Sequence, residues 1–139
     1  MKAEMKYLLL LTVISFLFSC KNKDEEYHKP ESALDAGREF IDHSLKGRFN
    51  TAKRYMLQDD DNVYWLNKIS SDYSKVSEQE KAGYSKASIN IKEVTDVVAD
   101  SVTIISYSNS YRNRPAKIKV VKYNGDWVVD FKYTFSGNL

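Results

Sequence analysis

The sequence predicts an α+β fold, in which N-terminal helices pack on one face of a curved four-stranded antiparallel sheet. Apolar residues recur at helical spacing from Ser32 to about Tyr84, and from Ser88 onwards they alternate with a period of two. A helical half followed by a stranded half is typical of α+β domains. The 139-residue chain divides into residues 1–19, 20–30 and 31–139, and the last of these is long enough for one domain with one core.

Two helices are predicted at the start of the domain. Ser32 is a good N-cap for the first, and Gly47 fits the left-handed residue that ends many helices. Between them the apolar residues lie at helical spacing, at Leu34, Phe40, Ile41 and Leu45. Asn50 can cap a second, short helix. Its apolar residues are Ala52, Tyr55 and Met56.

Two more helices are predicted before the sheet. Residues 59–61 are aspartates, and such side chains cap and stabilise a helix N-terminus. The amphipathic helix that follows has its apolar positions at Val63, Leu66, Ile69, Tyr73 and Val76. Ser77 and Glu80 form a capping box, in which each side chain accepts from the backbone N–H of the other residue. A last short helix therefore runs to about Tyr84.

Four strands are predicted in the second half. The first contains Ile89, Ile91 and Val94, the second spans residues 102–111, and the third spans residues 117–124. In the fourth, residues 127–135, every second residue is apolar, at Trp127, Val129, Phe131, Tyr133 and Phe135. Asn124-Gly125 tolerates positive φ and joins the last two strands in a tight hairpin. We expect Trp127 to face the helices.

The N-terminal segment has the features of a bacterial secretory signal. Lys2 and Lys6 supply a basic start, and residues 7–18 form an apolar run. This run is too short for a transmembrane helix, which needs about 20 residues. Ser19 precedes Cys20, the only cysteine of the chain, and the pattern from Leu17 to Cys20 resembles the lipobox of bacterial lipoproteins. The resemblance implies cleavage between Ser19 and Cys20, lipidation of Cys20, and anchoring in the bacterial cell envelope, at the outer membrane.

Residues 20–30 have almost no apolar side chains and end in a proline, so we expect a flexible tether between the anchor and the domain. Within it, Asp24, Glu25 and Glu26 resemble the acidic export signal of lipoproteins that some Gram-negative lineages display on the cell surface. A solvated run of charges explains the same three residues equally well, so a periplasmic and a surface-exposed location both stay open. His28 is expected to be solvated.

A family resemblance covers most of the domain, residues 31–135. It is carried by the helix corner, with Phe40, Leu45, Gly47, Ala52 and Tyr55, and by the hairpin sequence Asn124-Gly125-Asp126-Trp127-Val128-Val129-Asp130. These residues resemble a family of uncharacterised bacterial lipoproteins with a nuclear transport factor 2-like domain, also described as lumazine-binding-like. The resemblance implies a conical half-barrel whose mouth holds a small molecule or is filled by side chains.

Enzymes in this superfamily, such as those of the ketosteroid isomerase type, place an acid and a tyrosine inside the cone. Asp130 and Tyr107 are the residues that could take these roles. Alternation along the last strand places Asp130 on the face opposite Trp127, beside Lys132 and towards solvent. We therefore predict no catalytic residue, and an isomerase- or hydratase-like enzyme is the alternative. The candidates for a pocket are Tyr107, Tyr111 and Trp127.

Composition argues against several other classes of function. A formal net charge of +2 gives no reason to expect nucleic acid as a partner. With one cysteine and two histidines, neither a transition-metal site nor another cofactor is expected, and His43 is expected at the surface or at its boundary with the core. Residues 59–62 do not begin a calcium loop, because Tyr64 and Ser70 stand where an EF-hand needs glycine and glutamate.

The sequence thus predicts an exported lipoprotein, anchored to the membrane by its lipid, with a non-enzymatic binding or scaffold domain. Its partners would be the membrane and an unknown small molecule or envelope protein. The alternative is a small cone-fold enzyme or small-molecule carrier with a pocket between the helices and the sheet. A pocket with a buried acid would favour an enzyme, whereas a cone filled by aromatic side chains would favour the first interpretation.

Overall fold

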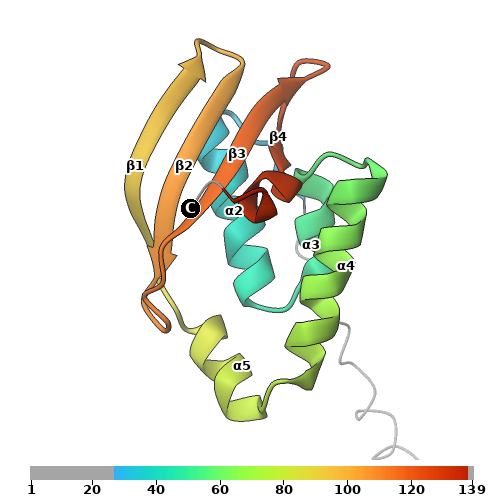
Figure 1. Ribbon diagram of the computed structural model, residues 1–139, viewed down its shortest axis with the longest axis vertical. Coiled ribbons are helices and arrows are strands. Elements are labelled where there is room, and N and C mark those ends of the chain that lie inside the picture. The colour runs from blue at the N-terminus through green and yellow to red at the C-terminus, as the bar shows by residue number, and fades with distance from the viewer. Residues whose placement is uncertain (1–26, 138–139) are drawn as a thin grey trace, which may run out of the picture.

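The computed structural model describes residues 27–137 and has the predicted α+β architecture (Figure 1). Within this part of the chain the helices come first, as α2 (Ala33–Leu45), α3 (Phe49–Ala52), α4 (Asp60–Lys75) and α5 (Glu78–Ser85). A 3-10 helix, η2 (Lys53–Tyr55), follows α3 directly. The strands are β1 (Ile89–Val98), β2 (Val102–Asn109), β3 (Ala116–Tyr123) and β4 (Asp126–Asp130), and a second 3-10 helix, η3 (Phe131–Phe135), comes last.

The four strands form one antiparallel sheet in the order β1-β2-β3-β4, so each strand pairs with its neighbours in the sequence. The turn between β3 and β4 is made by Asn124 and Gly125, whose φ values are 50° and 84°. A two-residue turn with both φ values positive has the twist that an antiparallel hairpin needs. The predicted hairpin is therefore confirmed.

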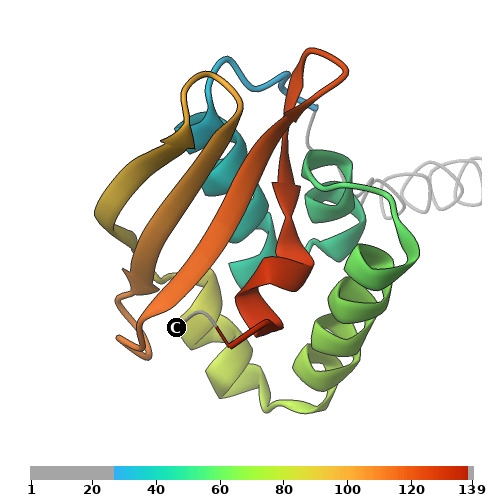
Figure 2. The ribbon, with the colours of Figure 1, turned by 45° about the horizontal axis from the view of Figure 1, so that its top comes forward.

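Helix α2 lies across one face of the sheet and contacts all four strands (Figure 2). Gly37 makes the close approach: a Cβ at this position would lie 2.6 Å from Cδ1 of Ile105 and 3.1 Å from Cδ1 of Ile118. Ile105, Ile118, Val120 and Val129 are fully buried in the layer between α2 and the sheet. The complete set of buried apolar residues is Ala33, Ala36, Phe40, Ile41, Ala52, Tyr55, Met56, Leu66, Ile105, Ile118, Val120, Val129 and Phe131.

Local signals determine most helix ends as predicted. The Ser32 hydroxyl accepts from the backbone N–H three residues later, at 3.1 Å, and caps α2. Gly47 has a φ of 71° and ends the turn after this helix, and the capping box of α5 begins at Ser77. The prediction that Asn50 caps the second helix was wrong. Helix α3 begins earlier, because the carbonyl of Arg48 already accepts the first two helical hydrogen bonds.

The final strand is shorter than predicted. The alternating pattern predicts a strand to Phe135, but β4 ends at Asp130 and the chain turns into η3. Long-range packing is the reason. The ring of Phe131 lies 4.8 Å from that of Phe40 on α2, and Phe135 stacks on Trp65 of α4 with 4.0 Å between ring centroids. Both contacts draw the chain away from the sheet and towards the helices.

Residues 27–30, which we expected in the flexible tether, instead contact the domain. The ring of Tyr27 lies 5.1 Å from that of Tyr55. The backbone N–H of His28 donates to the Tyr55 hydroxyl at 3.2 Å, and the ammonium group of Lys29 lies 2.7 Å from the carboxylate of Asp126 at the end of the sheet. An aromatic contact and an ion pair therefore hold this segment in place, although its composition is polar.

The described part of the chain contains its own core, a cluster of buried hydrophobic residues that runs from Ala33 to Phe131. No helix within residues 27–137 combines the length and the apolar character needed to cross a bilayer. The predicted signal and lipidation residues, Ser19 and Cys20, lie outside the described residues, as do Asp24, Glu25 and Glu26.

Candidate functional site

A cavity of about 590 Å³ lies between the helices and the end of the sheet where β2 connects to β3. Its volume is within the range of small-molecule sites, roughly 300–1,000 Å³. The walls come from α2, α4, α5, η3 and the sheet. Its apolar and aromatic lining includes Phe40 and Ile41 of α2, Ile69 of α4, Tyr107 of β2 and Phe135 of η3.

Tyr107 brings a hydroxyl group to the wall of the cavity. Burial raises the pKa of Tyr107 to about 12, because a phenolate would be poorly solvated there. A phenol is neutral at physiological pH with or without this shift, and it can both donate and accept a hydrogen bond. Beside it, Ala116 pairs with Tyr107 across the strands and lines the same cavity.

Three charged residues line the cavity, and two of them, Asp72 and Arg112, form ion pairs with residues outside it, while Arg114 is the third. The carboxylate of Asp72 lies 3.1 Å from Nζ of Lys68 and 3.6 Å from Nζ of Lys75. The hydrogen bond from Lys68 holds the pKa of Asp72 below its usual range. Arg112 pairs with Glu80 of α5 at 2.5 Å. The lining is thus mainly apolar, with the phenol of Tyr107, the ion-paired Asp72 and Arg112, and the guanidinium of Arg114.

Asp130 is buried, which corrects the expectation that it faces solvent. Its carboxylate pairs with Lys119 of β3 at 2.5 Å and accepts from Nδ2 of Asn62 at 3.1 Å, and 5% of the residue is exposed. Asn62 is fully buried; it also donates to Asp59 at 2.7 Å and accepts from the backbone N–H of Lys132 at 2.9 Å. The reason is long-range, because the first turn of α4 lies against the end of β4 and covers this carboxylate.

Asp130 and Tyr107 lie on opposite faces of the sheet. Directly paired residues on neighbouring strands point to the same face. Asp130 pairs with Lys119, whose neighbours in β3, Ile118 and Val120, point to the core under α2. Tyr107 lines the cavity on the α2 side, and Asp130 is not among the lining residues of that cavity. The two residues therefore do not form an acid–tyrosine pair.

His43 is buried within α2, whereas the sequence predicts it at the surface. Its ring stacks on Tyr55 with 5.7 Å between centroids, and its Nε2 lies 3.5 Å from the carboxylate of Glu39. Position 43 falls on the same helix face as Ala36 and Phe40, which explains its burial. His43 does not line the cavity.

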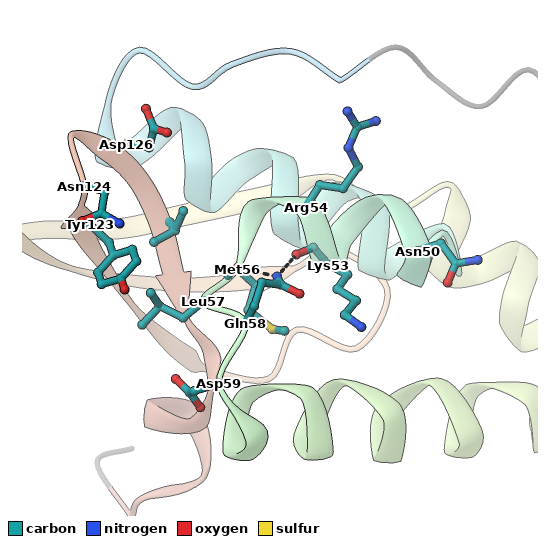
Figure 3. A pocket seen from close by; sticks show the side chains of 11 residues that line it. Asn50, Lys53, Arg54, Met56, Leu57, Gln58, Asp59, Tyr123, Asn124 and Asp126 are labelled. Carbon is teal, nitrogen blue, oxygen red and sulfur yellow. Dashed lines mark hydrogen bonds between the residues drawn. The ribbon is translucent and has the colours of Figure 1, made fainter.

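A second hollow, of about 830 Å³, lies beside β4 (Figure 3). Met56, Leu57 and Val128 supply apolar surface, and the amide of Gln58 donates to the carbonyls of Lys53 and Met56 at 2.5 and 2.6 Å. The charged residues around the hollow are Lys53, Arg54, Asp59 and Asp126. Their side chains point in different directions and carry both signs, so they do not converge on one ligand group (Figure 3).

The structure separates the three residues that the sequence suggested for a pocket. Tyr107 lines the cavity. Tyr111 does not line it, but packs edge-on against Tyr84, a lining residue, with 5.0 Å between ring centroids. Trp127 is half-buried at the opposite end of the sheet, where Nζ of Lys122 lies 5.2 Å from its ring centroid.

The sequence suggested a pocket between the helices and the sheet, but of the residues that line the cavity it named only Tyr107. Ile69, Tyr73 and Phe135 belong to the predicted apolar faces, but apolar periodicity does not reveal whether packing leaves a space between those faces. Asn62 and Asp130 have no local signal for burial.

No protein-family model, curated protein or solved structure matches this chain.

Proposed function

We propose that this chain is an exported lipoprotein, anchored in the outer membrane through Cys20, whose domain binds a small and mainly apolar molecule without transforming it. The lipobox-like sequence that ends at Cys20 supports the anchor. The cavity between the helices and the sheet supports the binding function. For the fold we propose a conical half-barrel of the nuclear transport factor 2-like type, with this cavity at its mouth.

The apolar lining is the observation that carries the proposal. Phe40, Ile69 and Phe135 contribute apolar surface to a space of about 590 Å³, and Tyr107 adds a neutral hydroxyl. Small-molecule sites are typically apolar, with a few polar groups that fix the orientation of the ligand. A ligand with an aromatic or alicyclic body and one carbonyl or hydroxyl group matches this chemistry.

The positions of the acids favour binding over an isomerase or hydratase. General acid–base catalysis needs an acid or base within hydrogen-bond reach of the substrate. Asp130 lies on the other face of the sheet and is bonded to Lys119 and Asn62. Asp72 lines the rim, but its pKa is lowered by the hydrogen bond from Lys68, which makes it a weaker base.

A tryptophan that fills the cavity tests the binding function. A chain beginning at Lys21 is titrated with anilinonaphthalene sulfonate, a probe that fluoresces in apolar surroundings. Ala116→Trp projects beside Tyr107 into the cavity, and Ala99→Trp is the matched control, because Ala99 is exposed in the β1–β2 turn. We expect one saturable site in the wild type and in Ala99→Trp, and at least about tenfold weaker binding in Ala116→Trp. Equal binding by all three would contradict the proposal.

A further inference from the structure

The face of the sheet that turns away from α2 carries a row of four valines, one from each strand. Val98 pairs with Val102, Val102 with Val121, and Val121 with Val128. Paired residues point to the same face, and Val121 alternates with Val120, which is buried under α2. The row therefore points away from the core. Figure 1 looks onto this face, with α2 behind the strands.

The valine row belongs to a larger apolar surface. Val98 is 51% exposed, and Tyr123, which lies on the same face two residues beyond Val121, is 58% exposed. Val102 and Ile104 continue the surface along β2 and are half-buried. Single exposed apolar residues are normal, and only apolar patches larger than a few hundred Å² mark interaction sites by themselves, so the charges on this face decide whether it is an interface.

One pair of charges on the same face has a self-complementary arrangement, whereas Lys119, also on this face, is paired with Asp130 of its own chain. Glu93 pairs with Ser106, and Ser106 pairs with Lys117, so these three residues form another row across the sheet. The acid lies on β1 and the base on β3, one strand to either side of β2. A two-fold axis along β2 would therefore place Glu93 opposite Lys117 of a second copy, and would do so twice.

We propose that this face is the interface of a homodimer, with the two-fold axis running along β2. Val98 then meets Val121 of the second copy, while Val102 and Ile104 each meet their own counterparts near the axis. Packed sheets lie about 10 Å apart, with strands inclined by about 30°. An axis within about 15° of β2 produces that inclination, so the pairing of the rows agrees with ordinary sheet packing.

The charges favour a second copy over a membrane surface as the occupant. Glu93 and Lys117 have opposite signs, whereas an anionic membrane attracts a basic surface. Moving a carboxylate into lipid without a partner is costly. A second copy supplies a partner of opposite charge for both Glu93 and Lys117, and its valines pack against the valines of the first copy.

The association is expected to be weak. The central patch comprises three strands about 4.8 Å apart and five residues of about 3.3 Å along each strand. The area of this patch is smaller than the roughly 800 Å² per partner that stable complexes bury. We therefore expect a weak dimer that forms at high protein concentration and dissociates to a monomer on dilution. The inference is independent of the ligand and of the lipid anchor proposed above.

Sedimentation equilibrium of the chain beginning at Lys21, at low ionic strength, tests the proposal. Glu93→Lys and Lys117→Glu each place like charges opposite one another, so each should weaken dimerisation at least about tenfold. The double variant restores opposite charges and should dimerise within about threefold of the wild type. Lys86→Glu is the control for the change in net charge, because Lys86 is exposed after α5.

Rescue by the double charge reversal, together with loss of the dimer in Val98→Lys, would support the proposed axis. A wild type that stays monomeric at about 1 mM overturns the proposal. So does a dimer that none of these substitutions weakens, because its interface would lie elsewhere. A monomer that co-sediments with phosphatidylglycerol vesicles also overturns it, in favour of a sheet that faces lipid. Circular dichroism of each variant verifies that the fold is retained.

Discussion

Asn62→Ala removes a buried side chain that joins the start of α4 to the end of β4. The Asn62 amide donates to Asp59 at 2.7 Å and to Asp130 at 3.1 Å, and its oxygen accepts from the backbone N–H of Lys132 at 2.9 Å. Asn62 is fully buried and Asp130 is 5% exposed. In the variant, the Lys132 N–H loses its acceptor and Asp130 loses one donor, in a place that solvent reaches poorly.

The size of the effect follows from these contacts. An unpaired buried polar group costs about 1–3 kcal/mol, and a hydrogen bond to a charged group contributes about 1.5–3 kcal/mol. With one backbone donor and one carboxylate contact affected, we expect the free energy of unfolding to fall by about 3–4 kcal/mol. The higher helix propensity of alanine offsets at most about 0.7 kcal/mol. A domain of this size has about 5–15 kcal/mol in total, so the loss is a large fraction.

Urea unfolding followed by circular dichroism measures this loss. Asn67→Ala is the matched control, because Asn67 is exposed on the same helix and undergoes the same change in helix propensity. With a slope of about 1–2 kcal/mol per molar urea, Asn62→Ala should lower the midpoint by about 1.5–4 M, and Asn67→Ala should leave it nearly unchanged. Equal midpoints for the two variants would refute the reasoning, because the buried hydrogen bonds would then contribute nothing.

Two further predictions concern packing and acid stability. Gly37→Val should destabilise the fold by about 2–3 kcal/mol in urea titration, because its Cβ would lie 2.6 Å from Cδ1 of Ile105; an unchanged midpoint would mean that α2 moves freely away from the sheet. The pKa of Asp59 is lowered from 3.8 to about 2, first by the backbone N–H of Asn62 and also by Lys132. The stabilisation from this depressed pKa is present above pH 4 and is lost as the pH falls towards about 2. Since 42% of the side chain is exposed, screening limits the effect to about 1 kcal/mol. Asp59→Asn should flatten the pH dependence of the unfolding midpoint in that window, and an unaltered profile would count against this assignment.

Features that depend on a few neighbouring residues could be predicted from the sequence. Ser32 and Ser77 cap helices by accepting from backbone N–H groups three residues away. Asn124 and Gly125 form a tight turn because both residues adopt positive φ values. The change from helical spacing to a period of two gave the order of the elements. These local signals were sufficient for the α+β class and for most boundaries.

Features that depend on long-range packing could not be predicted in this way. Asp130 does lie on the face opposite Val129, as alternation indicates, but the first turn of α4 buries it. Phe131 continues the period of two, yet its ring meets Phe40 and the chain leaves the sheet. Tyr27 belongs to a segment of polar composition, and its partial burial depends on the ring of Tyr55, which is 28 residues further along the chain.

The cavity likewise depends on how separate elements meet. Its apolar lining residues are visible in the sequence as parts of helix and strand faces. The space between them is set by the positions of α4, α5 and η3, and Arg112 of the β2–β3 connection fixes α5 through its ion pair with Glu80. No short stretch of sequence contains that information.

The mass of the protein, isolated from the cell envelope of the bacterium that makes it, tests the central proposal most directly. Native mass spectrometry reports the lipid anchor and the bound ligand together. We expect a chain that begins at Cys20, carries a diacylglycerol and a further acyl chain, and retains a small-molecule adduct. Cys20→Ala should carry no acyl mass, and Ala116→Trp should lose the adduct but keep the lipid. A wild-type protein that lacks the acyl mass and retains no adduct would contradict the account.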